Sequence, residues 1–296
     1  DGAQNAVGAP SDARRPFSSL TDHQRGLLCM LGGVLLLVPD ATLVRLIHAP
    51  SLTSAMWRVG LTSVVLLMIM LKEYRTSLFT QIRSAGRWGA LAGILEGCSS
   101  VSFVLAVNNS SVANVLLILS TSSFWAALLS RIFLGSHVNR KTWIAMPLVF
   151  SGVAITVSGG LSAFRLGDGM ALLVSIQGAL RRTILRAHAG LDMLPVLASG
   201  GLTVSILLLL GGTRIHLQSG DWLPLLTLSV LIMPIARALL TKGSGLLPSA
   251  ESSMIMCIET VLSPILAAAA VGDQLPIATC VGGAVVVGAL LLHAAC

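Results

Sequence analysis

The sequence predicts an all-α membrane protein whose ten transmembrane helices form two inverted five-helix repeats. Three observations lead to this fold class: the composition, the spacing of apolar segments, and an internal similarity at a fixed offset. Hydrophobic residues make up 54% of the 296 residues and charged residues only 10%, whereas an ordinary soluble domain carries about 25% charged residues. A bilayer is the better solvent for such a chain, and a helix of about 20 apolar residues crosses it.

Apolar segments alternate with short polar breaks along most of the chain. Residues 1–25 are polar and contain no apolar run, so we expect a disordered cytoplasmic N-terminal segment there. The breaks at 48–51 and 107–110 are so short that the helices on either side must form hairpins. The expected helices span 26–47, 51–71, 88–107, 110–133, 142–158, 168–187, 193–211, 221–240, 246–270 and 276–295.

The distribution of basic residues predicts the orientation in the membrane. An even number of spans puts both termini on one side, and fifteen of the 19 Lys and Arg residues then fall on that side. Cytoplasmic loops carry such an excess of Lys and Arg. We therefore expect both termini in the cytoplasm and the protein in a plasma or inner membrane.

The two halves of the chain resemble each other at an offset of 137 residues. This shift places residues 32–47 over 169–184, and the same register places 120–138 over 257–275. Each half has an odd number of helices, so the halves have opposite orientations in the membrane. Inverted repeats are typical of secondary transporters with a site near the midplane.

Two segments at corresponding positions of the halves resemble one known family. Residues 116–159 look like the end of an EamA repeat of the drug/metabolite transporter superfamily, and residues 246–294 resemble the same element in the second repeat. The second segment places Ile258, Glu259 and Pro264 at the family's Leu-Glu-x-x-x-x-Pro pattern. The resemblance implies a ten-helix secondary transporter, often an exporter of small metabolites such as amino acids.

The resemblance divides the chain into two domains. It implies a first EamA-like repeat at 26–158 and a second at 168–295. The sequence departs from the family where a Glu usually follows the Gly of each turn, because Ser136 and Asp273 stand at these places. The match therefore identifies the class of transporter and leaves its cargo open.

Charged residues within the spans predict ion pairs at two depths. With a rise of about 1.5 Å per residue, Asp40 and Arg58 both lie about 10 Å below the outer ends of neighbouring helices. We expect them to pair, because a lone charge at this depth is costly. On the inner side, Glu251 lies level with Arg182 and Arg237, which predicts a counterpart there. Such pairs could act as gates, or they could hold the helices in place.

A third group of polar residues is a candidate for substrate binding or proton coupling. Glu96, Gln177, Ser122 and Glu259 fall near the middle of their expected helices, and Asn114 falls in the outer third of its helix. The repeat superposes Ser122 on Glu259. A carboxylate at mid-membrane either faces a wet cavity or is protonated through desolvation. We expect Glu259 to line the central site, with a structural bond to a neighbouring helix as the other option.

The charges also suggest the kind of cargo. The midplane carries the acids and the amide Glu96, Gln177 and Glu259, whereas every arginine falls in the outer or inner third. A phosphate carrier would favour arginines at the centre. We therefore expect alternating-access transport, in the export direction, of a small amino-acid-like or amine-bearing metabolite. Glu259 would be the amine partner or a proton carrier, and proton coupling stays open.

Two other classes of protein stay open. One is a membrane-embedded enzyme with Glu96 and Glu259 as an acid/base pair, and the other is a sensor or scaffold on the same fold. The inverted repeat favours transport, since an enzyme needs only one access route. The sequence has no H-E-x-x-H or P-loop motif, and its five cysteines lack metal-ligand spacing.

We accordingly expect no catalytic residues, no metal and no cofactor. The expected partners are a small-molecule metabolite and the lipid bilayer, without nucleic acid. Homodimerisation stays open.

Overall fold

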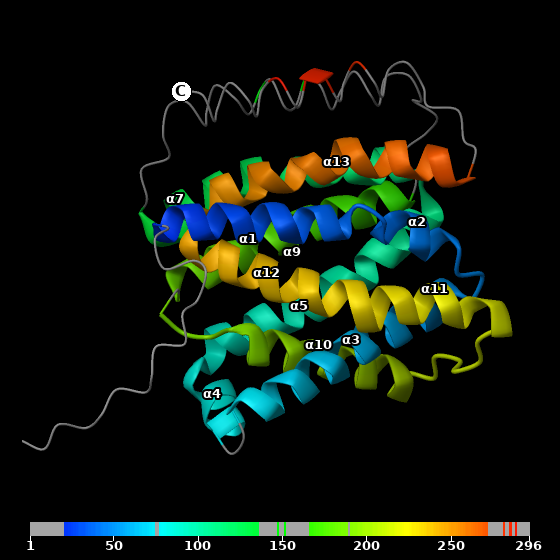
Figure 1. Cartoon of the computed structure of the whole chain (residues 1–296), viewed down its shortest axis with the longest axis horizontal. Helices are drawn as coiled ribbons and strands as arrows, with labels where there is room; N and C mark the ends of the chain where they lie inside the picture. The colour runs from blue at the N-terminus through cyan, green and yellow to red at the C-terminus, as the bar shows by residue number, and fades with distance from the viewer. Residues whose placement is uncertain are drawn as a thin grey trace, which may run out of the picture.

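The computed structural model is a bundle of helices with their axes roughly parallel (Figure 1). It describes residues 21–74, 77–135, 166–188 and 190–271, and single positions at 147, 151, 281, 284, 285 and 288. These residues contain no strand, so the all-α class is confirmed. The helices expected at 142–158 and 276–295 lie almost entirely outside the described residues.

The first half of the chain contains seven described helices. They are α1 (Asp22–Leu37), α2 (Asp40–Arg45), α3 (Ser51–Tyr74), α4 (Leu78–Ser84), α5 (Gly86–Asn109), α6 (Val112–Ser120) and α7 (Ser122–Leu134). The short helix α4 was not expected from the sequence, and it lies in the polar break between α3 and α5.

The described part of the second half is also helical. It contains α9 (Leu166–Ala187), α10 (Leu194–Leu210), the 3₁₀ turn η2 (Ser219–Asp221), α11 (Trp222–Leu226), the π-helical turn η3 (Thr227–Ile232), α12 (Met233–Leu246) and α13 (Ser249–Val271).

The N-terminal boundary of the bundle differs from the expectation. Helix α1 begins at Asp22 rather than near residue 26, because Thr21 and Gln24 form a capping box. Thr21 Oγ1 accepts from the Gln24 N–H, and Gln24 Oε1 accepts from the Thr21 N–H. Two otherwise unpaired backbone donors are thus bonded. Residues 22–25 are therefore helical, and the expected disordered segment falls on residues 1–20, outside the described residues.

Several expected helices are interrupted where side chains bond to the backbone or where proline removes a donor. The helix expected at 26–47 breaks at Pro39, which precedes α2. The helix expected at 110–133 breaks at Thr121, whose hydroxyl donates to the Ile118 carbonyl over 2.7 Å. The π-helical turn η3 comes directly before Pro234 near the start of α12. Each break lies in the interior of an apolar stretch.

Five described stretches are long and apolar enough to cross a membrane, by length and composition. They are Asp22–Arg45, Ser51–Tyr74, Gly86–Asn109, Asn114–Leu134 and Ser219–Leu246. Helix α10 is apolar but shorter. The expected multi-pass membrane protein is thus confirmed, whereas the number of ten spans stays a prediction.

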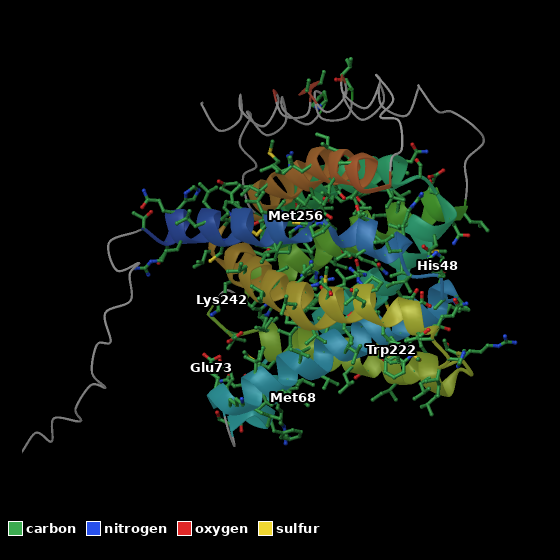
Figure 2. The ribbon with its side chains drawn as sticks, turned by 45° about the vertical axis from the view of Figure 1, so that its right-hand side comes forward. His48, Met68, Glu73, Trp222, Lys242 and Met256 are labelled. Atoms are coloured by element: carbon green, nitrogen blue, oxygen red, sulfur yellow. The ribbon has the colours of Figure 1, made fainter. Side chains whose placement is uncertain are left out.

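The two ends of the bundle are distinguished by their short helices. Helix α4 lies at one end, and α2 and α11 lie at the other (Figure 1); we call these the α4 end and the α2 end. Glu73 and Lys242 lie toward the α4 end, and His48 and Trp222 toward the α2 end (Figure 2). If the termini are cytoplasmic, as the basic residues predict, the α4 end faces the cytoplasm.

The packing of the helices supports the expected repeat. Helix α5 packs along α9, and α1 packs along α12. The offset of 137 residues makes α9 the equivalent of α1 and α2, and α12 the equivalent of α5. The two contacts are therefore one kind of contact made twice. The inverted repeat and its domain limits remain a prediction, because most of the last helix of each half lies outside the described residues.

Small residues let two helices approach closely near the centre. A Cβ atom added to Gly200 in α10 would lie 2.2 Å from the carbonyl carbon of Gly93 in α5. Such contact is typical of membrane helices that pack backbone against backbone. The close contact between Gly93 and Gly200 holds α5 against α10 and so helps to position the polar side chains of α5 that belong to the site.

Candidate functional site

A cavity lies among α1, α2, α3, α5, α6, α7, α9, α12 and α13. Its volume is about 90 Å³, enough for several water molecules or a small solute. We call it the central cavity. Its charged lining residues are Asp40, Arg58, Arg181, Arg182, Arg237 and Glu259. Serines and apolar side chains, among them Ser175 and Phe103, complete the wall.

The expected ion pair between Asp40 and Arg58 is present at this cavity. Arg58 Nη2 donates to Asp40 Oδ2 over 2.5 Å, and both residues are more than 95% buried. The Pro39 break places Asp40 at the start of α2. The Arg58 guanidinium also lies 5.3 Å from the centre of the Phe103 ring, a cation–π contact that steadies it.

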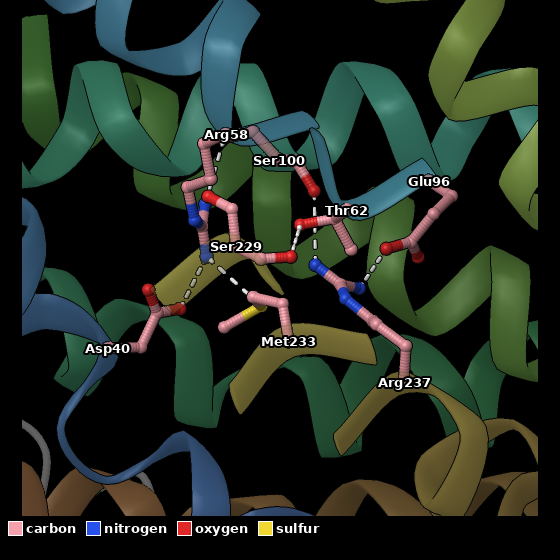
Figure 3. Close-up of polar contacts among 8 residues, drawn as sticks. All are labelled: Asp40, Arg58, Thr62, Glu96, Ser100, Ser229, Met233 and Arg237. Carbon is pink, nitrogen blue, oxygen red and sulfur yellow. Dashed lines mark hydrogen bonds and ion pairs between the residues drawn. The ribbon is translucent and has the colours of Figure 1, made fainter. Parts of the chain in front are cut away.

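A second set of charges surrounds Glu96 in α5. Arg181 Nε lies 2.9 Å from Glu96 Oε2, and Arg237 Nη1 contacts Glu96 Oε1. Arg237 Nη2 donates to Ser100 Oγ over 3.0 Å, and Arg58 Nη1 donates to the Ser100 carbonyl over 3.5 Å (Figure 3). Ser100 thus joins the two sets.

The connected residues form one unit that we call the charge network. It consists of Asp40, Arg58, Ser100, Arg237, Glu96 and Arg181. Five helices contribute to it: α2, α3, α5, α9 and α12. Removing one member of a buried ion pair typically costs about 3–5 kcal/mol, because the other charge is left behind. The network therefore ties these helices together at the level of the cavity.

Glu259 in α13 differs from the other acids. It is 4% exposed and lines the central cavity. Within the described residues, no hydrogen bond or ion pair joins its carboxylate to a side chain or backbone group. Asp40, Arg58 and Arg237 lie within electrostatic range of it. Glu259 is thus the lining carboxylate that is available to an incoming group.

The expected inner pairing is corrected by the structure. Glu251 was expected to pair with Arg182 or Arg237, but its Oε1 lies 3.1 Å from His23 Nε2. Arg237 pairs with Glu96 instead, and Arg182 Nε donates to Ser253 Oγ over 2.8 Å. The reason is the early start of α1, which brings His23 to the first turn of α13. The contact is at the α4 end as expected, with a histidine in place of an arginine.

Of the remaining candidate residues, one lines the central cavity and the others do not. Ser122 is buried and lines the central cavity. Gln177 and Asn114 are described, but they are not among the lining residues. The Asn114 backbone N–H donates to Ser111 Oγ, the side chain that caps the start of α6. Glu96 belongs to the charge network and does not line the central cavity.

Sequence reasoning missed the number of arginines at the site. It placed every arginine in the outer or inner third of the membrane, yet four arginine side chains line the central cavity. The long side chain carries the guanidinium several ångströms from its Cα atom. Arg181 and Ser100 were both missed as site residues. The adjacent pair of Arg181 and Arg182 within an otherwise apolar helix was the available signal.

Fold and cavity together define a multi-pass membrane protein with a cavity of mixed charge among its helices. The family model described as the EamA-like transporter family matches residues 24–158. The resemblance inferred from the sequence is therefore confirmed over residues 24–158, where the chain is similar to this family of membrane transporters.

A comparison of structures agrees with this class. A solved crystal structure, whose description names no activity, superposes with a TM-score of 0.73 over 92% of this chain and 97% of that chain. The two sequences are 16% identical, so this likeness shows the fold alone. No curated protein matches the sequence.

Proposed function

We propose that the protein is a secondary active transporter that carries a small zwitterionic, amino-acid-like metabolite by alternating access. One observation carries the proposal: the central cavity has guanidinium groups and the available carboxylate of Glu259 on its walls. A carboxylate of the solute would bind the arginines, and an ammonium group would bind Glu259. Both contacts are charge-assisted hydrogen bonds, which are the strong ones.

The balance of charges favours a zwitterion over a phosphate or a simple cation. Arg58, Arg181 and Arg237 already contact acids of the protein, so the cavity is not a concentrated positive site for a phosphate. A cation without a negative group would use Glu259 and leave the arginine wall unused. A zwitterion adds one partner of each sign and leaves no new buried charge unpaired.

Contacts between the two halves at both ends of the bundle suit alternating access. At the α2 end, the His48 N–H donates to Asp221 Oδ1 over 2.8 Å, and Trp57 Nε1 donates to the Ile215 carbonyl over 3.0 Å. At the α4 end, His23 contacts Glu251. Breaking one set while the other holds would open the cavity to one side at a time. We propose that the α4 end faces the cytoplasm and that export runs from it.

The enzyme alternative receives little support from the geometry. It needs Glu96 and Glu259 as an acid/base pair, but Glu96 is held by Arg181 and Arg237. A carboxylate between two guanidiniums is a poor proton donor or acceptor, because both cations stabilise its ionised form. Members of the matched family are transporters, which agrees with this reasoning.

The test is flux in proteoliposomes that contain the purified protein. Labelled zwitterionic amino acids should accumulate by counterflow in wild-type vesicles, and unlabelled amino acids should compete. Glu259→Gln keeps the shape of the side chain and removes its charge, so its flux should fall at least about tenfold, the loss expected when one charged hydrogen bond is removed. Glu73→Gln is the control, because this acid is exposed at the end of α3, away from the cavity and from the contacts between the halves.

Two results would contradict the proposal. One is an absence of flux for every zwitterionic amino acid while a sugar phosphate or an organic cation is carried. The other is full flux in Glu259→Gln, which would return this residue to a structural role. A proton gradient imposed on the same vesicles tests the coupling that the sequence left open.

A further inference from the structure

A second, smaller cavity lies beside the central cavity, among α3, α5, α10 and α12. Its volume is about 30 Å³, which leaves room for a few water molecules. We call it the lateral cavity. Arg58, Ser100 and Arg237 line both cavities. The two spaces are therefore separated by the charge network itself.

The lateral cavity leads from the charge network toward the α4 end. Its α10 wall includes Gly201 near the network and Leu194, the first residue of that helix. These two positions are about 10 Å apart along the helix axis. On α12 the wall reaches Thr241, one turn or so before the helix ends at Leu246.

A contact near the far end of the lateral cavity joins the end of α3 to the loop before α10. The Tyr74 hydroxyl, on the last residue of α3, donates to Asp192 Oδ2. Asp192 Oδ1 accepts from the N–H of Leu194, which lines the cavity. The side chains of Tyr74 and Asp192 thus join the ends of two helices that flank the cavity.

The lining of the lateral cavity suits water. Ser63 and Thr241 line it, and both are more than 90% buried. Within the described residues their hydroxyls have no hydrogen-bond partner. Thr62, on the same wall, donates instead to the Ser229 carbonyl over 3.1 Å. Buried hydroxyls of this kind are normally bonded, and water is the remaining partner.

Within the charge network, which separates the two cavities, Arg237 has several possible partners. Arg237 contacts Glu96, and Asp40 and Glu259 lie within its electrostatic range. It follows the π-helical turn η3 and Pro234 by less than two turns of helix. Single π turns are rare and frequently occur at functional sites, where the helix can change its local winding. A change at η3 would carry Arg237 with α12.

We propose that the lateral cavity is a hydrated arm of the transport path that leads to the α4 end, and that Arg237 is the residue that opens it. In the structure Arg237 is held by Glu96 and Ser100 and closes the partition. When it turns toward Glu259, the two cavities join. The identity of the solute that passes through the lateral cavity depends on the proposed function. The hydration of this cavity and its connection to the α4 end are inferred from the geometry alone.

Cysteine accessibility tests the arm without any substrate. In a background with all five native cysteines replaced, Ser63→Cys and Thr241→Cys introduce one thiol each into the lateral cavity. Met68→Cys in α3 and Ile235→Cys in α12 are matched controls, because these side chains are 60% and 51% exposed within stretches that can cross the membrane, where lipid would surround them. Met68 lies on the outside of the bundle (Figure 2). The reagent is 2-(trimethylammonium)ethyl methanethiosulfonate, applied to membrane vesicles from either side.

We expect the two cavity thiols to react at least about tenfold faster than the controls, since only a hydrated thiol ionises readily. Reaction should come from the side of the α4 end. Adding Arg237→Gln should open the partition and allow reaction from the α2 end as well. Ala198→Leu, which fills the lateral cavity from α10, should suppress the reaction of Ser63→Cys.

The outcomes separate the two proposals. Cavity thiols that react no faster than the controls would overturn the arm and leave the proposed transport standing. Reaction that is equal from both sides in the presence of Arg237 would overturn its closing function. Reactive cavity thiols in vesicles that show no amino-acid flux would support the arm and contradict the proposed function alone.

Discussion

At the scale of single residues, the pair of Asp40 and Arg58 permits a direct test of coupling. Asp40→Asn should destabilise the protein by about 3–5 kcal/mol, because Arg58 is then buried beside a neutral group. Adding Arg58→Gln should restore part of this loss, and the two effects should fail to add by about 0.5–3 kcal/mol. Thermal unfolding in detergent measures both. Glu73→Gln removes an acid from the exposed end of α3 and should change little; strictly additive losses would show that the pair is not coupled.

The geometry of Arg237 also separates arginine from lysine. Its two terminal nitrogens reach Glu96 and Ser100 at once, and a lysine has only one ammonium group to offer. Arg237→Lys should therefore lower the free energy of unfolding by about 1.5–3 kcal/mol, the value of one hydrogen bond to a charged group. Arg186→Lys is the matched control, because among the described residues Arg186 donates to a single acceptor, the Gly245 carbonyl. Equal losses in the two variants would contradict the bridging function.

The same residues show how far the sequence could predict the site. Asp40 and Arg58 were predictable, because they lie on neighbouring helices of a hairpin at equal depth. The contacts of Glu96 were not, since Arg181 and Arg237 come from helices distant in the sequence and reach it through long side chains. The partner of Glu251 depended on where α1 begins, an end effect that apolar periodicity does not record.

At the scale of the elements, the crossing of α5 and α10 makes the sharpest prediction. A methyl group at Gly200 would collide with the Gly93 backbone, which a rotamer change cannot relieve. Gly200→Ala should therefore destabilise the protein by about 1–3 kcal/mol. Gly32→Ala in α1 is the control, because its Cβ would meet only Leu239 Cδ1 at 3.6 Å. That change should stabilise the helix by up to about 1 kcal/mol. If Gly200→Ala and Gly32→Ala shift the melting temperature in the same direction, the close crossing is contradicted.

The elements themselves were largely predictable, and their interruptions were not. Nearly every expected helix with described residues is present, because apolar segments of sufficient length leave a chain in lipid few options other than helix. The breaks at Thr121 and η3 depend on individual hydrogen bonds: the Thr121 hydroxyl donates to the Ile118 carbonyl, and the Thr62 hydroxyl donates to the Ser229 carbonyl in η3. Hydropathy treats both positions as ordinary helix interior. These interruptions lie at the cavities, where local rules are most often broken.

At the scale of the whole molecule, the orientation can be tested by labelling. In a background without native cysteines, Ser219→Cys places an exposed thiol at the α2 end and Ser84→Cys places one at the α4 end. An impermeant maleimide added to intact cells should label Ser219→Cys, and it should label Ser84→Cys only after permeabilisation. The physical reason is the excess of basic residues on the side of the α4 end. The reverse pattern would invert the proposed direction of export.

The contact between Ser100 and Arg237 has one more consequence. These residues are 137 positions apart, which is also the offset that aligns the two halves of the sequence. In a molecule built from two related halves, equivalent positions meet only close to the axis that relates them. Two identical halves would place either two arginines or two serines together there. Two arginines would repel each other, and two serines would leave Glu96 without the cation that Arg237 provides. If the repeat predicted from the sequence is correct, one chain that carries both halves escapes that constraint, and its two halves can place an arginine against a serine at the centre.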